Sequence, residues 1–195
     1  MRLMAPRFRV TGRKNVPRTG AVILACNHIS DADPLLVGAA TLRPTGYMAK
    51  RELWQIGWLA PILDLVGSFP VDPGAPDRAA LRKSEGILAR GEALVVFPEG
   101  RISPEGKLAP LLPGVLQLAL KSGAPIVPVG LSGANLVVPY GELVPRPTLG
   151  AVSLHYGAPI SLDDLQTMPK RQAREIARER LEAGLRTAIE RAERG

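Results

Sequence analysis

The sequence has 195 residues, of which 46% are hydrophobic and 22% are charged. This composition argues against disorder except at the ends, and the length fits a single domain, 1–195, with room for a sizeable core. The formal net charge of +7 favours anionic partners, such as phosphorylated ligands, anionic lipid surfaces or nucleic acid. Cys26 is the only cysteine, which excludes an intramolecular disulfide.

Apolar runs and helical spacing alternate along the chain. In order, they predict a strand at 21–26, a helix at 33–40, a strand at 46–50, a helix at 52–66, a strand at 68–72, a helix at 77–90, a strand at 93–97, a helix at 111–121, strands at 125–131 and 151–156, and a helix at about 169–192. Asp33 before Pro34 is typical of a helix cap followed by the first helical residue. Gly57 and Pro61 are expected to weaken or kink their helix. The alternation predicts an α/β domain with a central mixed, mostly parallel sheet flanked by helices.

Charged and apolar segments also indicate which partners to expect. The long C-terminal helix mixes arginine with glutamate, which is typical of a solvated face, so we expect no nucleic-acid binding. The basic N-terminus is not followed by an apolar run, and nowhere do about 18 consecutive apolar residues occur. We therefore expect neither a signal peptide nor a transmembrane helix.

The first chemical motif is the segment 27–33, which directly follows the first predicted strand. His28 stands at the carboxyl end of that strand, where α/β domains place their ligands. Asp33 follows across a short turn, so its carboxylate can accept a hydrogen bond from one ring nitrogen and leave the other as a base. A purely structural alternative makes Asp33 a helix cap, Asn27 and Asp31 turn residues, and the histidine a polar residue at a strand end.

The second chemical motif, at 97–101, reads Phe-Pro-Glu-Gly-Arg and ends another predicted strand. Gly100 lets the backbone approach a ligand, and Arg101 can hold a phosphate through two hydrogen bonds. Glu99 either holds that arginine or contacts a substrate hydroxyl. The structural alternative is an ordinary turn with a surface ion pair.

Together these motifs resemble those of the glycerolipid acyltransferases. His28 and Asp33 match the family's His-x4-Asp motif in its fuller form Asn-His-x-Ser-x-x-Asp, and 97–100 matches its Phe-Pro-Glu-Gly motif. The family's other motifs are matched, in order, at 48–53, 67–72 and 127–129. The likeness covers about residues 8–160. The chain is similar to bacterial lysophosphatidate (1-acylglycerol-3-phosphate) acyltransferases and to relatives with another lyso-lipid acceptor.

The resemblance implies a reaction and roles for the matched residues. His28 would remove the proton from an acceptor hydroxyl and Asp33 would orient it, so that the oxygen attacks the thioester of acyl-CoA or acyl-carrier protein without an acyl-enzyme. No metal and no cofactor beyond the acyl donor is implied. The residues that would bind the lyso-phospholipid and its glycerol phosphate are Glu99, Gly100, Arg101, Lys50, Phe97 and Ser30.

Two departures from the family pattern lie at the acceptor end. Pro73 stands where the second family motif often has arginine. The phosphate contact expected there must come from elsewhere, from Lys50, Arg78 or Arg82, or be absent. Arg101 stands one place earlier than the arginine of the form Phe-Pro-Glu-Gly-Thr-Arg-Ser.

Other residues with reactive side chains are interpreted as structural. A thiol nucleophile at Cys26 is the alternative to a small core residue, and its apolar strand favours the core residue. Ser132 lacks the Gly-x-Ser-x-Gly elbow of serine hydrolases, and His155 lies in a strand pattern. No cluster has the spacing of metal ligands, so we expect no metal.

Both tryptophans, Trp54 and Trp58, lie in the predicted helix at 52–66, beside Lys50 and Arg51. A buried core helix is the commoner outcome for such a segment. Tryptophans at i and i+4 beside basic residues are also typical of an interfacial helix, and we favour peripheral contact with the cytoplasmic side of an anionic cell membrane. The same apolar surface can instead line an acyl-chain tunnel.

The predicted function is acyl transfer in phospholipid biosynthesis by a peripheral membrane enzyme. Two alternatives stay open. One is an acyl thioesterase or hydrolase in which the His28–Asp33 pair activates water, and the other is a catalytically idle lipid-binding or scaffold protein of the same fold. A nucleic-acid binder fits only the net charge.

Overall fold

The computed structural model describes residues 7–195, apart from residues 66, 72–77, 104, 142–145 and 147–149. Its strands are β1 (Arg7–Thr11), β2 (Val22–Cys26), β3 (Thr45–Lys50), β4 (Ser68–Val71), β5 (Ala93–Val96), β6 (Ile126–Ser132) and β7 (Ala151–Tyr156). Its α-helices are α1 (Asp33–Ala40), α2 (Ala60–Leu65), α3 (Arg78–Ala89), α4 (Pro113–Ser122), α5 (Ala134–Val137) and α6 (Lys170–Glu193). Short 3₁₀ turns occur at Arg13–Asn15, Arg51–Gln55 and Asp163–Leu165.

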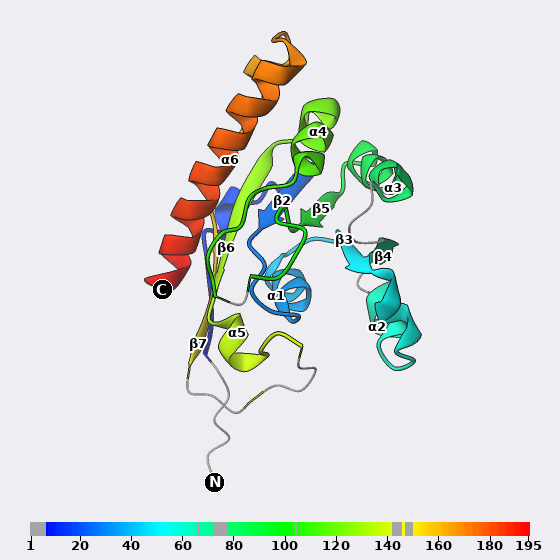
Figure 1. Ribbon diagram of the computed structural model, residues 1–195, viewed down its shortest axis with the longest axis vertical. Helices are drawn as coiled ribbons and strands as arrows, with labels where there is room; N and C mark the ends of the chain where they lie inside the picture. The colour runs from blue at the N-terminus through cyan, green and yellow to red at the C-terminus, as the bar shows by residue number, and fades with distance from the viewer. Residues whose placement is uncertain (1–6, 66, 72–77, 104, 142–145, 147–149) are drawn as a thin grey trace.

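The strands form one mixed sheet in the order β1-β7-β6-β2-β5-β3-β4 (Figure 1). Every neighbouring pair is parallel except β6 and β7, which run antiparallel. The predicted α/β architecture with a mixed, mostly parallel sheet is therefore confirmed. Because β2 lies between β5 and β6 and is parallel to both, the segment after β2 leaves the sheet at their shared carboxyl edge.

Both faces of the sheet are buried, which explains why its central strands are continuous apolar runs. Alternate residues of β2 point to opposite faces. Ile23 and Ala25 pack in the core that includes α3, α4 and α6, whereas Leu24 and Cys26 pack in the core that includes α1. Full burial of a leucine or isoleucine side chain stabilises the fold by roughly 1.5–3 kcal/mol, so this strand anchors both layers.

The predicted helix at 52–66 is wrong as a single element. The chain forms the 3₁₀ turn at Arg51–Gln55 and then α2, and residue 66 lies outside the described residues. Gly57 falls in the break. Pro61 is the second residue of α2, where the missing N–H removes no helical hydrogen bond. These two residues were expected to weaken or kink the helix, and they divide it.

The sequence patterns missed two elements. β1 is an edge strand whose residues are mostly exposed, with arginine at positions 7 and 9, so it lacks the apolar run of the central strands. α5 is a four-residue helix that begins after Gly133, and it is too short for a helical period to show. The remaining predicted elements have their bounds within a residue or two of those expected, where the structure describes them.

Gly130 in β6 lies directly beneath α6, and a Cβ at this position would stand 2.1 Å from the carbonyl oxygen of Ala188. The backbone of α6 cannot yield locally, so Gly130→Ala is expected to lower the free energy of unfolding by about 3 kcal/mol, the upper part of the range for overpacked cores. Urea denaturation followed by circular dichroism measures this loss.

Gly114 in α4 is the matched control, because a Cβ there would meet nothing within 4 Å. Gly114→Ala is expected to be neutral or to raise the free energy of unfolding by about 0.5–1 kcal/mol. Equal stabilities of the two variants would contradict the close approach of α6 to β6.

Candidate active site

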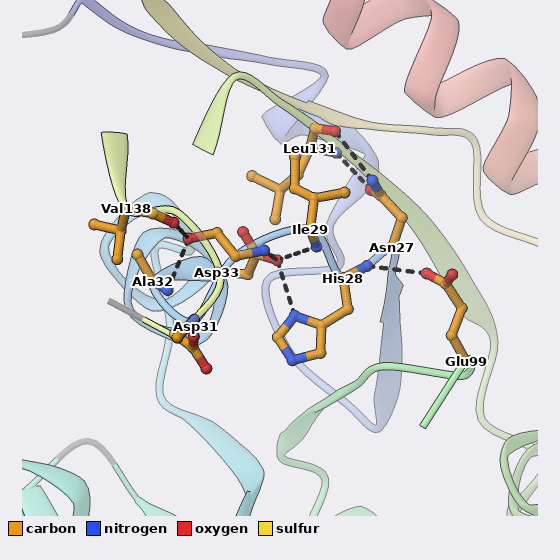
Figure 2. A network of polar contacts seen from close by, with 11 residues as sticks. Asn27, His28, Ile29, Asp31, Ala32, Asp33, Glu99, Leu131 and Val138 are labelled. Carbon is orange, nitrogen blue, oxygen red and sulfur yellow. Dashed lines mark hydrogen bonds and ion pairs between the residues drawn. The ribbon is translucent and has the colours of Figure 1, made fainter. Parts of the chain in front are cut away.

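The first motif forms the turn between β2 and α1, at the carboxyl edge of the sheet (Figure 2). Asn27 anchors the start of this turn. Its Nδ2 donates to the Leu131 carbonyl at 3.1 Å, and its Oδ1 accepts from the Leu131 N–H at 2.7 Å. The buried amide therefore continues the pairing of β2 with β6 beyond the end of β2 and holds the turn to the sheet.

The hydrogen bond predicted between His28 and Asp33 is present. His28 Nδ1 lies 2.9 Å from Asp33 Oδ2, and Nε2 lies on the other side of the ring (Figure 2). The Asp33 side chain is fully buried, whereas the His28 side chain is 16% exposed. A carboxylate in this position favours protonation of Nδ1 and leaves the Nε2 lone pair to accept a proton. The pair therefore has the geometry of a general base.

Asp33 is the first residue of α1 and not its cap. The N-cap is Ala32 and Pro34 is the second helical residue, so the predicted cap is wrong by one position. The Asp33 carboxylate points back toward residues 28–30 of the turn instead. Its Oδ2 accepts from the N–H groups of Ile29 at 2.6 Å and Ser30 at 2.9 Å, in addition to the imidazole. These donors compensate the burial of the carboxylate and shape the turn around it.

The second motif packs directly against the histidine. The Phe97 ring stacks on the His28 imidazole, with the two ring centroids 4.1 Å apart and an angle of 26° between the planes. Phe97 is the residue that follows β5, and β5 pairs with β2 in parallel, so both residues leave the sheet at the same edge. This stacking restricts rotation of the imidazole.

Glu99 is buried, and its carboxylate contacts the backbone of His28 and of Ala109. Its Oε1 accepts from the His28 N–H at 3.0 Å (Figure 2), and its Oε2 accepts from the Ala109 N–H at 2.7 Å. Burial raises the pKa of the Glu99 carboxyl, and these two hydrogen bonds oppose the rise. The His28 carbonyl accepts from the Ser103 N–H at 2.7 Å. The second motif and Ser103, two residues after it, therefore contact both polar groups of the His28 backbone.

Gly100 and Arg101 are the exposed part of the second motif. Gly100 has a φ of 64°, in the left-handed region that favours glycine. A Cβ there would stand 2.3 Å from Leu112 Cδ1, so Leu112 closes one side of this turn. The other side of the motif leaves backbone and guanidinium groups accessible to an anionic ligand.

Ser30 is fully buried, and its hydroxyl is engaged within the protein. The hydroxyl donates to the Val138 carbonyl at 2.7 Å and accepts from the Ala32 N–H at 3.1 Å (Figure 2). The segment after α5 is thereby tied to the first motif. These contacts favour a structural contribution of Ser30 to the turn.

The basic residues considered for the acceptor phosphate are distributed over β3 and α3. Lys50 is the last residue of β3, and its side chain lies outside the described part of the structure, as does that of Arg78 at the start of α3. Pro73 also lies outside the described residues. Arg82 is exposed on α3.

Cys26 is fully buried in β2, which confirms its interpretation as a small core residue. Burial raises the pKa of the Cys26 thiol well above its usual value, and the negative charges of Asp33 and Glu99 add to the rise. His155 in β7 lies with Nδ1 2.8 Å from Thr11 Oγ1, a contact that joins β7 to the edge strand β1. Within the described ranges, no group of three or more His, Cys, Asp and Glu side chains could hold a metal ion.

Comparison with known proteins agrees with the motifs. A family model described as Acyltransferase matches residues 7–132, which include both motifs. The chain belongs to the acyltransferase family. This confirms the family resemblance predicted from the sequence.

The similar proteins include several that are named 1-acyl-sn-glycerol-3-phosphate acyltransferase. This acyltransferase is 28% identical to a 1-acyl-sn-glycerol-3-phosphate acyltransferase of Bacillus subtilis over 165 residues, 84% of its own chain and 79% of the relative. It is 31% identical to the enzyme of the same name from Borreliella burgdorferi over 128 residues, 65% of its own chain and 51% of the relative. It therefore spans most of the first relative and about half of the second.

A solved structure shares the fold of this acyltransferase. The crystal structure of PlsC, the 1-acyl-sn-glycerophosphate (LPA) acyltransferase of Thermotoga maritima, matches with a TM-score of 0.73 and 26% identity. The match covers 93% of this chain and 72% of PlsC. The overall fold of this chain is thus similar to one already seen in the family.

The motifs alone did not reveal the groups that hold this site together. Leu131, Ala109 and Val138 contribute only backbone N–H or carbonyl groups, so their side chains carry no signal in the sequence. Only the structural alternative gave Asn27 a role, that of a turn residue, and the signal for its actual role is a polar amide directly after a buried strand.

Proposed function

We propose that this acyltransferase moves a fatty acyl group from a thioester donor, acyl-CoA or acyl-carrier protein, to the hydroxyl of lysophosphatidate or a related lyso-phospholipid. The observation that carries the proposal is the His28–Asp33 pair, with 2.9 Å between Nδ1 and Oδ2, at the carboxyl edge of the sheet. The names of the Bacillus and Borreliella relatives support the substrate class. A net charge of +7 suits an anionic acceptor.

In the proposed reaction, His28 Nε2 takes the proton of the acceptor hydroxyl while that oxygen attacks the thioester carbonyl. Asp33 holds Nδ1–H and stabilises the imidazolium that forms. Collapse of the tetrahedral intermediate breaks the C–S bond, and the leaving thiolate takes the proton back from the imidazolium. The scheme needs no acyl-enzyme, no metal and no cofactor besides the acyl donor.

We assign the acceptor phosphate to Gly100 and Arg101. Both are exposed, and their neighbours Glu99 and Ser103 contact the His28 backbone. A guanidinium can bind a phosphate through two parallel hydrogen bonds. Lys50 and Phe97 are further proposed substrate contacts. For Glu99 and Ser30 the structure favours another role, since both Glu99 oxygens and the Ser30 hydroxyl have partners within the protein.

The proposal is tested with purified protein, labelled acyl-CoA or acyl-carrier protein, and a panel of lyso-lipids that includes lysophosphatidate. Transfer to at least one acceptor, in proportion to protein and time, is the expected result. Acyl release in the absence of an acceptor would instead show a thioesterase or hydrolase. Neither transfer nor release with any pair of substrates would show a catalytically idle lipid-binding protein.

We further propose that the protein binds peripherally to the cytoplasmic side of an anionic cell membrane through α2. Across the described ranges, no helix is long and apolar enough to cross a membrane. Trp58, Ile62 and Leu65 are 61%, 37% and 86% exposed. Trp58 lies in the turn before α2 and the other two lie in α2, and their spacing of four and three residues favours one side of this segment. They form an apolar surface suited to a lipid interface.

The two tryptophans differ in their surroundings. Trp54 packs against the small buried cluster that contains Leu59 and Leu63, and its Nε1 donates to Asp64 Oδ1 at 2.9 Å. Trp58 is mostly exposed. Only Trp58 of the two is therefore placed to enter the headgroup region, where tryptophan is enriched.

Trp58→Ala combined with Leu65→Ala is expected to lower binding to anionic vesicles at least tenfold. Burial of a large apolar side chain is worth roughly 1.5–3 kcal/mol, and about 1.4 kcal/mol corresponds to a factor of ten. Flotation with vesicles that contain phosphatidylglycerol measures the bound fraction. Phe8→Ala, which removes a 42%-exposed aromatic from the edge strand β1, is the control. Unaltered flotation of the double variant would refute docking through α2.

A further inference from the structure

Glu99 joins two separate parts of the chain through its two carboxylate oxygens. One oxygen accepts from the backbone N–H of His28 at 3.0 Å, and the other accepts from the backbone N–H of Ala109 at 2.7 Å. Glu99 is 4% exposed. A buried carboxylate with both oxygens facing backbone donors is poorly placed to contact a substrate directly.

The same segment holds His28 at two further points. The Ser103 N–H donates to the His28 carbonyl at 2.7 Å, and the Phe97 ring stacks on the imidazole with 4.1 Å between centroids. His28 is therefore held at its N–H, its carbonyl and its ring face by residues 97–103. Asp33 holds Nδ1, which leaves Nε2 as the polar group of His28 that none of these contacts involves.

We propose that Glu99 is a positioning residue that sets the place of the His28 base relative to the acceptor and does not bind the acceptor. This role rests on the acyl transfer proposed above. Arg101 lies between Glu99 and Ser103, the two residues that hold the His28 backbone. The proposed phosphate contact and the base thus belong to one hydrogen-bonded unit, so an acceptor held at Arg101 presents its hydroxyl at a set distance from Nε2.

This position requires a glutamate, because two backbone N–H groups need two acceptors. A glutamine has the same length, but its NH₂ group is a donor and would face one of the two N–H groups. One of these partly buried N–H groups would then lack its partner, and the contact between Glu99 and that backbone group would shift to relieve it. An aspartate keeps the charge but is one methylene shorter, so it cannot reach both donors.

Steady-state kinetics of Glu99→Gln separate positioning from binding. We expect kcat to fall on the order of 10²-fold, because a displacement of about 1 Å can cost that much. We expect the KM for the lyso-lipid acceptor to stay within about twofold of the wild type. Glu105→Gln is the matched control, since Glu105 is an exposed glutamate further along the same connection, and it should behave as the wild type. A raised acceptor KM with unchanged kcat would overturn the proposal, because it would show that Glu99 binds the acceptor.

A second measurement does not depend on activity. His28 and His155 are the only histidines, so ¹⁵N-histidine spectra of the full chain, assigned with His155→Gln, report on His28 directly. In Glu99→Gln and in Glu99→Asp, the Nδ1–H signal of His28 is expected to shift or broaden, while the ring signals of His155 stay in place and show that the fold persists. An unchanged His28 signal would overturn the positioning role. If the wild type transferred no acyl group, the proposed function would fail, and the spectra would still decide the role of Glu99.

Discussion

His28→Ala is expected to reduce acyl transfer by roughly 10³-fold or more, near the upper end of the range for a positioned general base. The variant removes Nε2, the proton acceptor of the proposed reaction, together with the Nδ1 that Asp33 holds at 2.9 Å. Because the imidazole lies at the surface end of the turn, 16% exposed, its loss should leave the core intact. Initial rates of labelled acyl transfer, with circular dichroism to confirm folding, measure the effect.

His155→Ala is the matched control for this variant. His155 is the second histidine of the chain and lies in β7, where it contacts Thr11. Its removal should weaken the attachment of the edge strand β1 and leave the transfer rate within about twofold of the wild type, since it does not touch the reacting atoms. A folded His28→Ala protein that transfers at the wild-type rate would refute the proposed base.

Asp33→Asn is expected to lower kcat by roughly 10²- to 10³-fold with little change in the acceptor KM. The amide oxygen can still accept from the N–H groups of Ile29 and Ser30, so the turn should persist. Asp33 Oδ1 is buried and accepts no hydrogen bond from the residues that the structure describes, so an NH₂ group in its place opposes no donor there. The substitution therefore removes mainly the charge that stabilises the imidazolium.

Asp31→Asn provides the control for the loss of a carboxylate in the same turn. Asp31 is exposed, and its Oδ2 accepts from the Gly141 N–H at 3.0 Å. The kcat of Asp31→Asn should equal that of the wild type. If Asp33→Asn also kept the wild-type kcat, Asp33 would only stabilise the turn, and its proposed role in the base would be refuted.

Several strands were predictable because helices cover both faces of the sheet. Every residue of β2 and β5 is buried, and a short uninterrupted apolar run is typical of such strands. β1 escaped prediction because it is an edge strand with exposed arginines, and only its pairing with β7 identifies it. Fully buried strands could therefore be predicted from the sequence, whereas the exposed edge strand could not.

The segment 51–65 shows where a local pattern misleads. Its apolar residues continue at helical spacing across Gly57 and Pro61, which predicted one helix. The chain breaks there instead, and Leu59 and Leu63 pack against Ala49 at the end of β3 while Trp58 turns outwards. Which tryptophan packs against this small cluster depends on that arrangement and could not be derived from the spacing.

The two carboxylates that contact His28, those of Asp33 and Glu99, differ in how much of their role could be predicted from the sequence. His28 and Asp33 are five residues apart, so the turn that joins them is local. The spacing made their hydrogen bond possible, and the resemblance to the family motif favoured it over a helix cap beside an unrelated histidine. Glu99 is separated from His28 by 71 positions and meets its N–H only because β2 and β5 are adjacent parallel strands that end at the same edge. A backbone N–H is present at nearly every residue and has no sequence signature, so the partners of a buried carboxylate emerge only when the sheet is assembled.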